Sequence, residues 1–167
     1  MTDFFDLAVM IENEDWERRL PDADALARRA ALAAFAAVPH PARPCEAGLL
    51  LTDDTAVRAL NRDYRGQDKP TNVLSFPAWD GEDLPEGAAV PLGDVAIALG
   101  VLAAEAEVEG KPLADHFSHL VVHGILHLMG HDHERGEREA AAMEDLECRV
   151  LAALGIPDPY REPEGFA

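Results

Sequence analysis

Hydrophobic and polar positions along this chain predict about four strands and several helices. Short runs of bulky apolar residues predict strands over residues 4–11, 47–51, 72–76 and 94–99. Longer segments rich in Ala, Leu and Arg predict helices over residues 22–37, 53–64, 100–110, 112–129 and 136–154. Because strands and helices do not strictly alternate, we expect an α+β fold in which a small mixed sheet packs against helices.

The boundaries of these elements come from breaker and capping residues. Pro39 and Pro41 are expected to end the first helix, and Asp53 or Asp54 to cap the second. A long acidic loop is expected over residues 77–91 and a C-terminal tail over residues 155–167. Nothing repeats and no low-complexity linker divides the chain, so residues 1–167 are expected to form one domain.

Composition narrows the class of protein. Apolar residues make up 48% of the 167 positions, which is enough for a packed core. No uncharged apolar run reaches the length of a membrane span, and the acidic N-terminus lacks the basic region of a secretory signal. Cys45 and Cys148 show no CxxC spacing. We interpret them as buried thiols in a reducing cytoplasm, with a disulfide as the alternative.

The net charge of −18 argues on its own against a nucleic-acid-binding protein, because phosphate binding depends largely on Lys and Arg. The basic residues are unevenly spread, however. Twelve positions contain four of the fourteen Lys and Arg residues, namely Arg58, Arg62, Arg65 and Lys69. The ordinary interpretation of such a cluster is a solvated helix face with ion pairs.

Four histidines share one side of the helix predicted over residues 112–129. At about 100° per residue, His116, His119, His123 and His127 fall in a sector roughly 80° wide, beside a broad apolar sector. The helix is therefore expected to be central and buried. Buried imidazoles need partners, and a metal ion is one such partner.

The spacing of three histidines predicts a metal site. His123 and His127 lie one turn apart, Gly130 is placed to end the helix, and His133 follows. Three protein ligands leave a fourth position open, which is typical of a catalytic site. His131 is the alternative third ligand. His116 and His119 are expected to support the site or the core, and Asp132 to hold one histidine by a hydrogen bond.

The same spacing occurs in metzincin proteases, which carry a glutamate base immediately after the first histidine. Here that position is Gly124, so the proton acceptor of the protease mechanism is missing. A zinc metallopeptidase is therefore the disfavoured alternative. A second alternative is a non-catalytic protein with a structural zinc, against which the three-ligand pattern argues.

Two motifs resemble the YbeY family. The first is His123-Gly-Ile-Leu-His127-Leu-Met-Gly130-His131-Asp-His133, in which His131 stands where many members have Tyr. The second is Leu60-Asn-Arg-Asp-Tyr-Arg65-Gly-Gln-Asp-Lys69-Pro-Thr-Asn-Val-Leu-Ser-Phe-Pro77. Leu92-Gly-Asp94, Gly110-Lys-Pro and Asp158-Pro-Tyr160 also fit, so the similarity runs over residues 47–160.

The resemblance implies a single-strand-specific endoribonuclease with one zinc ion per chain, acting in 16S rRNA 3′-end maturation and ribosome quality control in the bacterial cytoplasm. It implies as partners single-stranded RNA, rRNA, the small ribosomal subunit and its assembly factors. In this context the non-catalytic alternative is a ribosome-assembly factor. The resemblance also implies that Arg65 faces the metal cleft, where its planar fork suits a phosphate. Arg58, Arg62 and Lys69 are then expected to help bind the substrate.

Overall fold

The computed structural model describes residues 5–79, 83–131 and 136–160, which form four strands and six helices. The strands are β1 (Phe5–Ile11), β2 (Cys45–Thr52), β3 (Val73–Pro77) and β4 (Val90–Ala98). The helices are α1 (Asp15–Arg19), α2 (Ala23–Ala36), α3 (Asp54–Arg65), α4 (Leu99–Glu109), α5 (Leu113–Leu128) and α6 (Glu137–Ala153). The expected α+β class, with one small mixed sheet, is confirmed.

The sheet has the strand order β1-β2-β4-β3. β1, β2 and β4 run parallel, with Leu49 of β2 beside Val95 of β4, whereas the edge strand β3 runs antiparallel to β4. The parallel strands are linked by helical crossovers, as parallel pairs require. The short antiparallel edge strand completes the sheet on the side where the histidine helix also makes contact.

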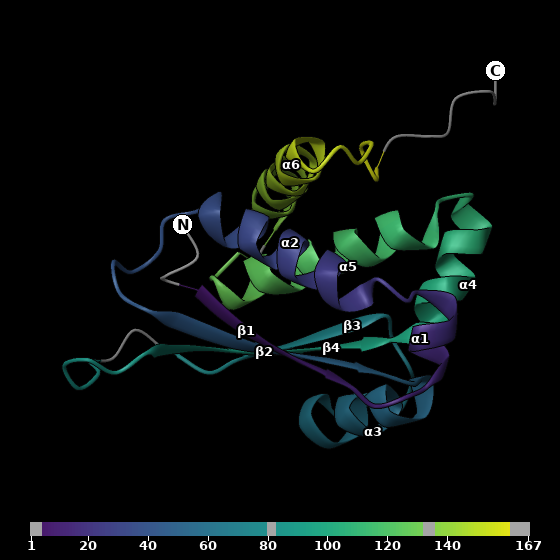
Figure 1. The fold of residues 1–167 in the computed structure, drawn as a ribbon, viewed down its shortest axis with the longest axis horizontal. Helices are drawn as coiled ribbons and strands as arrows, with labels where there is room; N and C mark the ends of the chain where they lie inside the picture. The colour runs from purple at the N-terminus through teal and green to yellow at the C-terminus, as the bar shows by residue number, and fades with distance from the viewer. Residues whose placement is uncertain (1–4, 80–82, 132–135, 161–167) are drawn as a thin grey trace.

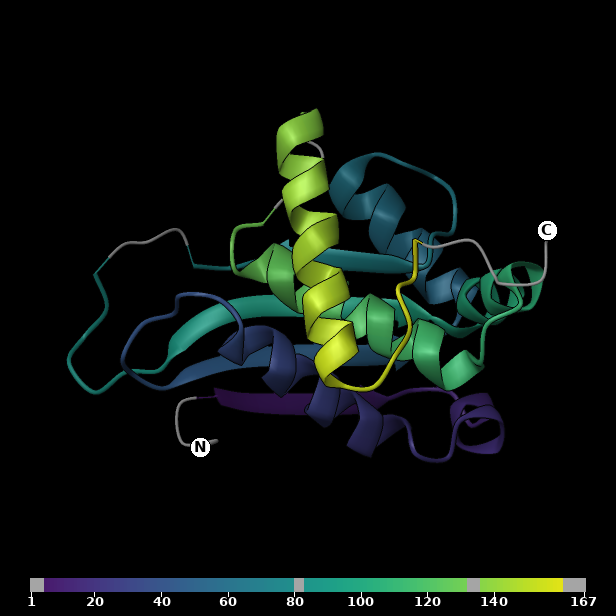
Figure 2. The same cartoon turned by 90° about the horizontal axis from the view of Figure 1, so that it is seen from above.

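Helices cover the two faces of the sheet unequally (Figure 1). α2 and α5 lie on one face, with α6 above them, and α3 lies on the opposite face. Seen from above, α6 crosses over α5 (Figure 2). α5 is thus enclosed between the sheet, α2 and α6, which explains why its sequence is apolar around most of its circumference.

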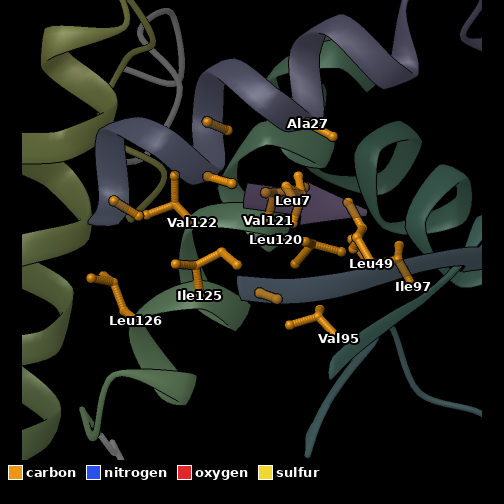
Figure 3. Packing of buried hydrophobic residues seen from close by; sticks show 14 of the residues in the cluster. Leu7, Ala27, Leu49, Val95, Ile97, Leu120, Val121, Val122, Ile125 and Leu126 are labelled. Atoms are coloured by element: carbon orange, nitrogen blue, oxygen red, sulfur yellow. The ribbon is translucent and has the colours of Figure 1, made fainter. Parts of the chain in front are cut away.

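The core forms around α5, as the sequence predicts. Val121, Val122 and Ile125 are at most 1% exposed and belong to the same buried cluster as Leu49 and Val95 of the sheet (Figure 3). Close packing of this kind makes the interior sensitive to even one added methyl group. The helix that carries the histidines is therefore rigidly held by its apolar side.

Gly124 of α5 packs directly against Val95 of the sheet. A Cβ atom placed there would lie 2.7 Å from Cγ1 of Val95 and 3.0 Å from its Cγ2. Val95 is 1% exposed and β-branched, so its side chain has little freedom to turn away. Any side chain at this position, including the glutamate that metzincins carry there, would therefore clash with the sheet unless Val95 moved.

We expect Gly124→Ala to destabilise the protein although alanine is the better helix former. Alanine gains about 0.5–1 kcal/mol over glycine in a helix, whereas overpacking a core costs about 1–3 kcal/mol. The net loss, about 1–2 kcal/mol, would appear in urea unfolding. Val95→Ala should remove the clash, so the double variant should lose less than the sum of the single variants. Simple additivity would contradict the proposed contact.

Two strand starts and one short helix differ from the sequence prediction. β2 begins at Cys45, and β4 begins at Val90, so the connection after β3 is shorter than the expected loop over residues 77–91. Pro91 lies inside β4 although a proline cannot donate a hydrogen bond to a ladder. The structure accommodates it beside a register shift between Glu46 and Ala47. The short helix α1 was not predicted; its Trp16 is fully buried and donates to the carbonyl oxygen of Thr52.

Both cysteines are free thiols, as the preferred interpretation expected. Cys45 is buried in β2, but Cys148 on α6 is only partly buried and donates to Oδ1 of Asp158 at 3.1 Å. Burial, this hydrogen bond and neighbouring carboxylates raise the pKa of Cys148 to about 12.

No helix in the described ranges is long and apolar enough to cross a membrane.

Candidate active site

A polar cavity of about 560 Å³ lies between the α3–β3 region and the histidine side of α5. One wall comes from the end of α3, the following loop and β3, and the other from α4 and α5. The residues with polar side chains on its walls include Asn61, Arg65, Gln67, Lys69, Asn72, Ser75, Glu105, His116, His119, His123, His127 and Tyr160. The two sequence motifs, far apart along the chain, therefore meet at one cavity.

The end of α3 positions the basic residues of this cavity. Gly66 adopts the left-handed conformation (φ 69°) that ends the helix, and the side chain of buried Asn61 donates to the carbonyl oxygen of Lys69 at 2.9 Å. These contacts turn the chain back toward β3. As a result, Arg65 and Lys69 both line the cavity.

The other two members of the basic cluster lie on the exposed side of α3. Nε of Arg58 is 2.8 Å from Oδ1 of Asp68, and Nε of Arg62 is 2.9 Å from Oδ1 of Asp63. Neither arginine is among the cavity-lining residues. The cluster therefore divides into two cavity residues and two residues that fit the solvated, ion-paired face.

The α5 histidines follow one another along the cavity wall. The ring centroids of His123 and His127 are 6.0 Å apart, and those of His119 and His123 are 6.5 Å apart. His116 lies at the far end, where its Nε2 is 2.9 Å from Oε1 of Glu105. His123 and His127 thus take the one-turn spacing expected of two ligands of one ion.

The helix ends where the sequence predicts. Gly130 has φ 96°, its amide donates to the carbonyl oxygen of His127, and the amide of His131 donates to that of Leu126. The chain therefore turns directly after the two histidines. The expected ligand His133 and the neighbouring Asp132 lie outside the described residues. Within the described ranges no group of three potential metal ligands is complete.

Glu147 of α6 is a site residue that the sequence reasoning missed. Its side chain is fully buried, and its carboxylate accepts hydrogen bonds from Nε2 of His119 at 3.2 Å and from Nδ1 of His123. Burial alone raises its pKa, but the hydrogen bonds from His119 and His123, the charge of His123 and the bond from Tyr160 together lower it to about 2. The sequence feature that could have revealed Glu147 is an acidic residue on the otherwise apolar face of α6, beside Leu146 and Val150.

Tyr160 reaches the same carboxylate from the C-terminal segment. Its hydroxyl donates to Oε2 of Glu147, and its ring lies edge-on to His119 with centroids 5.4 Å apart. Nζ of Lys111 donates a hydrogen bond of 2.7 Å to the carbonyl oxygen of Pro159, the residue before Tyr160. Burial and the charge of Glu147 raise the pKa of Tyr160, so its hydroxyl remains a donor. The segment from residue 155 to 160 is therefore attached to the site.

His123 and His127 fit a metal ion chemically. When Nδ1 of His123 donates to Glu147, the lone pair of the neutral ring is on Nε2, the nitrogen that would bind the ion. Histidine ligands commonly have a carboxylate on their other ring nitrogen. The one-turn spacing of this pair and the carboxylate behind His123 are therefore compatible with a bound metal ion.

Comparison with known proteins agrees with the two motifs. Residues 10–155 match the family model described as endoribonuclease YbeY. Among similar proteins are "Endoribonuclease YbeY" of Paramagnetospirillum magneticum, 54% identical over 97% of this chain and 99% of that protein, and the one of Rhodospirillum rubrum, 54% identical over 95% and 83%. The fold resembles the solution structure of a Thermotoga maritima protein, with a TM-score of 0.58 and 20% identity over 95% of this chain and 99% of that one. This chain belongs to the YbeY family.

Proposed function

We propose that this chain is a zinc-dependent endoribonuclease that cleaves single-stranded RNA in 16S rRNA 3′-end maturation and ribosome quality control. The observation that carries the proposal is that Arg65 and the pair His123 and His127 line one and the same polar cavity. The curated relatives named as endoribonucleases support the reaction class. One zinc ion is assigned to His123, His127 and His133.

The residues of the cavity have distinct parts in this reaction. His123 and His127 hold the ion, which when bound supplies Lewis-acid polarisation of a phosphoryl oxygen and a water of lowered pKa. Arg65 binds the scissile phosphate with its planar fork and offsets the charge that develops there. Glu147 does not contact the RNA, because it is fully buried behind the histidines.

RNA affinity must come from a local surface, because the whole chain carries a net charge of −18. Lys69 lies in the same cavity as Arg65 and is assigned to the RNA backbone. Arg58 and Arg62 are assigned weaker, salt-sensitive contacts, since each is paired with a carboxylate on the exposed side of α3.

The proposed partners are rRNA, the small ribosomal subunit and its assembly factors, in the bacterial cytoplasm. A metallopeptidase is not supported, because Gly124 packs against Val95 and has no room for the base of that mechanism. A purely structural zinc is also disfavoured, because His123 and His127 lie on the wall of a cavity rather than in a closed four-ligand site.

Purified protein is expected to cleave labelled single-stranded RNA, to leave a duplex of the same sequence largely intact, and to leave casein intact. A chelator should abolish the RNA cleavage, and added zinc should restore it. The control is His127→Ala purified in parallel, which excludes a contaminating ribonuclease. Metal-dependent casein cleavage that His123→Ala removes would contradict the proposal, as would RNA cleavage unaffected by the chelator.

A further inference from the structure

The carboxylate of Glu147 accepts three hydrogen bonds, which come from two separate segments of the chain. Oε1 accepts from Nδ1 of His123, and Oε2 accepts from Nε2 of His119 and from the hydroxyl of Tyr160. α6 supplies the acid, α5 the two imidazoles and the C-terminal segment the phenol. Because both oxygens are engaged, the carboxylate cannot rotate without breaking at least one of these bonds.

A buried acid at this position lowers the stability of the fold, whereas an apolar residue would not. Its neighbours on the same face of α6 are Met143, Leu146, Val150 and Leu151, all buried. Removing a carboxylate from water is expensive and is tolerated only when hydrogen bonds compensate for it. The packing of α6 on α5 therefore does not by itself explain an acid here.

We propose that Glu147 is a positioning residue of the metal site, which fixes the ring orientation and the Nδ1–H tautomer of His123 so that Nε2 faces the ion. The inference rests on the proposed function, in which His123 is a ligand. His119 and Tyr160 act on Glu147 rather than on the ion: by engaging Oε2 they keep Oε1 directed at His123. Glu147 is 0% exposed, so it acts only through the histidine.

The first test needs no variant. In metal-free wild-type protein at mildly alkaline pH, nitrogen chemical shifts of selectively labelled histidine should show His123 in the Nδ1–H tautomer. Free histidine favours the Nε2–H tautomer, so the two outcomes are distinct. If His123 of the folded protein is in the Nε2–H tautomer, the inference is overturned, whether or not any variant folds.

The second test is zinc affinity measured by competition with a chromogenic chelator. Glu147→Gln keeps the shape but replaces one acceptor oxygen with an amide donor, so it cannot accept from both histidines. Loss of such a partner typically weakens metal binding about 10- to 100-fold, and we expect a change of that size. Tyr160→Phe, which leaves the contact to His123 in place, should weaken binding only about two- to fivefold, well below that range.

The matched control is Glu144→Gln, which removes the same charge from the same helix at an exposed position. We expect its zinc affinity to stay close to that of the wild type. An equal loss in both glutamine variants would overturn the inference in favour of a long-range charge effect. Unchanged affinity and tautomer in folded Glu147→Gln would also overturn it, whereas wild-type protein that binds no zinc would overturn the proposed function itself.

Discussion

His127→Ala is expected to reduce bound zinc from about one ion per chain to nearly none and to abolish RNA cleavage. A three-ligand site that loses one histidine retains only two protein ligands, too few to hold zinc against a competing chelator. The fold should survive, because His127 lies at the cavity wall and is only partly buried. The variant and the metal-free wild type should therefore differ by no more than about 1 kcal/mol in unfolding free energy.

Elemental analysis of dialysed protein measures the metal, and urea unfolding of the metal-free proteins measures the stability. Both proteins must be compared without metal, because an ion that binds only the folded state adds its own stabilisation. His40→Ala is the control: it also removes a histidine, but from the loop after α2, where the ring stacks on Phe35 with centroids 4.1 Å apart. Full zinc occupancy in His127→Ala would refute the ligand assignment.

Arg65→Ala is expected to slow single-turnover cleavage about thirty- to a thousand-fold at saturating RNA. The basis is the loss of one charge-assisted phosphate contact that acts in the transition state, roughly 2–4 kcal/mol. Zinc content should not change, because guanidinium is not a ligand. Arg65→Lys should recover only part of the rate, since an ammonium group does not reproduce the planar two-donor fork.

The matched control for Arg65 is Arg62, which lies almost one turn earlier on α3 but pairs with Asp63 outside the cavity lining. Arg62→Ala and Arg58→Ala should leave the saturated rate nearly unchanged. They should weaken RNA binding modestly and reduce its salt dependence, as expected for outer phosphate contacts. A folded Arg65→Ala protein with normal zinc and a near-normal rate would show that Arg65 has no part in the chemistry.

Features set by neighbours along the chain were predictable from the sequence. The helix carrying His123 and His127, its end at Gly130 and the cap of α3 by Asp53 depend on residues within about one turn of each other. The central position of α5 followed in the same way, because a helix that is apolar around most of its surface must be enclosed. These local signals also predicted the α+β class.

Features that depend on contacts between distant segments were not predictable from the sequence. Val90 and Pro91 extend β4 only because β2 is alongside, with a register shift that no local pattern reveals. Gly124 indicated from the sequence that the protease base is missing, but its close packing against Val95 could be found only in the structure. Both outcomes depend on how strands and helices pack, and sequence periodicity carries no information on such distances.

The sequence by itself determined where the potential metal ligands lie and how the helix beneath them begins and ends, because local hydrogen bonding and periodicity control both. Only the tertiary structure brought Arg65 and Lys69 to the same cavity as His123 and left Arg58 and Arg62 outside it. The tertiary structure also placed Glu147 of α6 against His119 and His123 of α5. Proximity of this kind arises from packing between elements far apart in the chain, where a buried carboxylate is stable only once its partners are assembled around it.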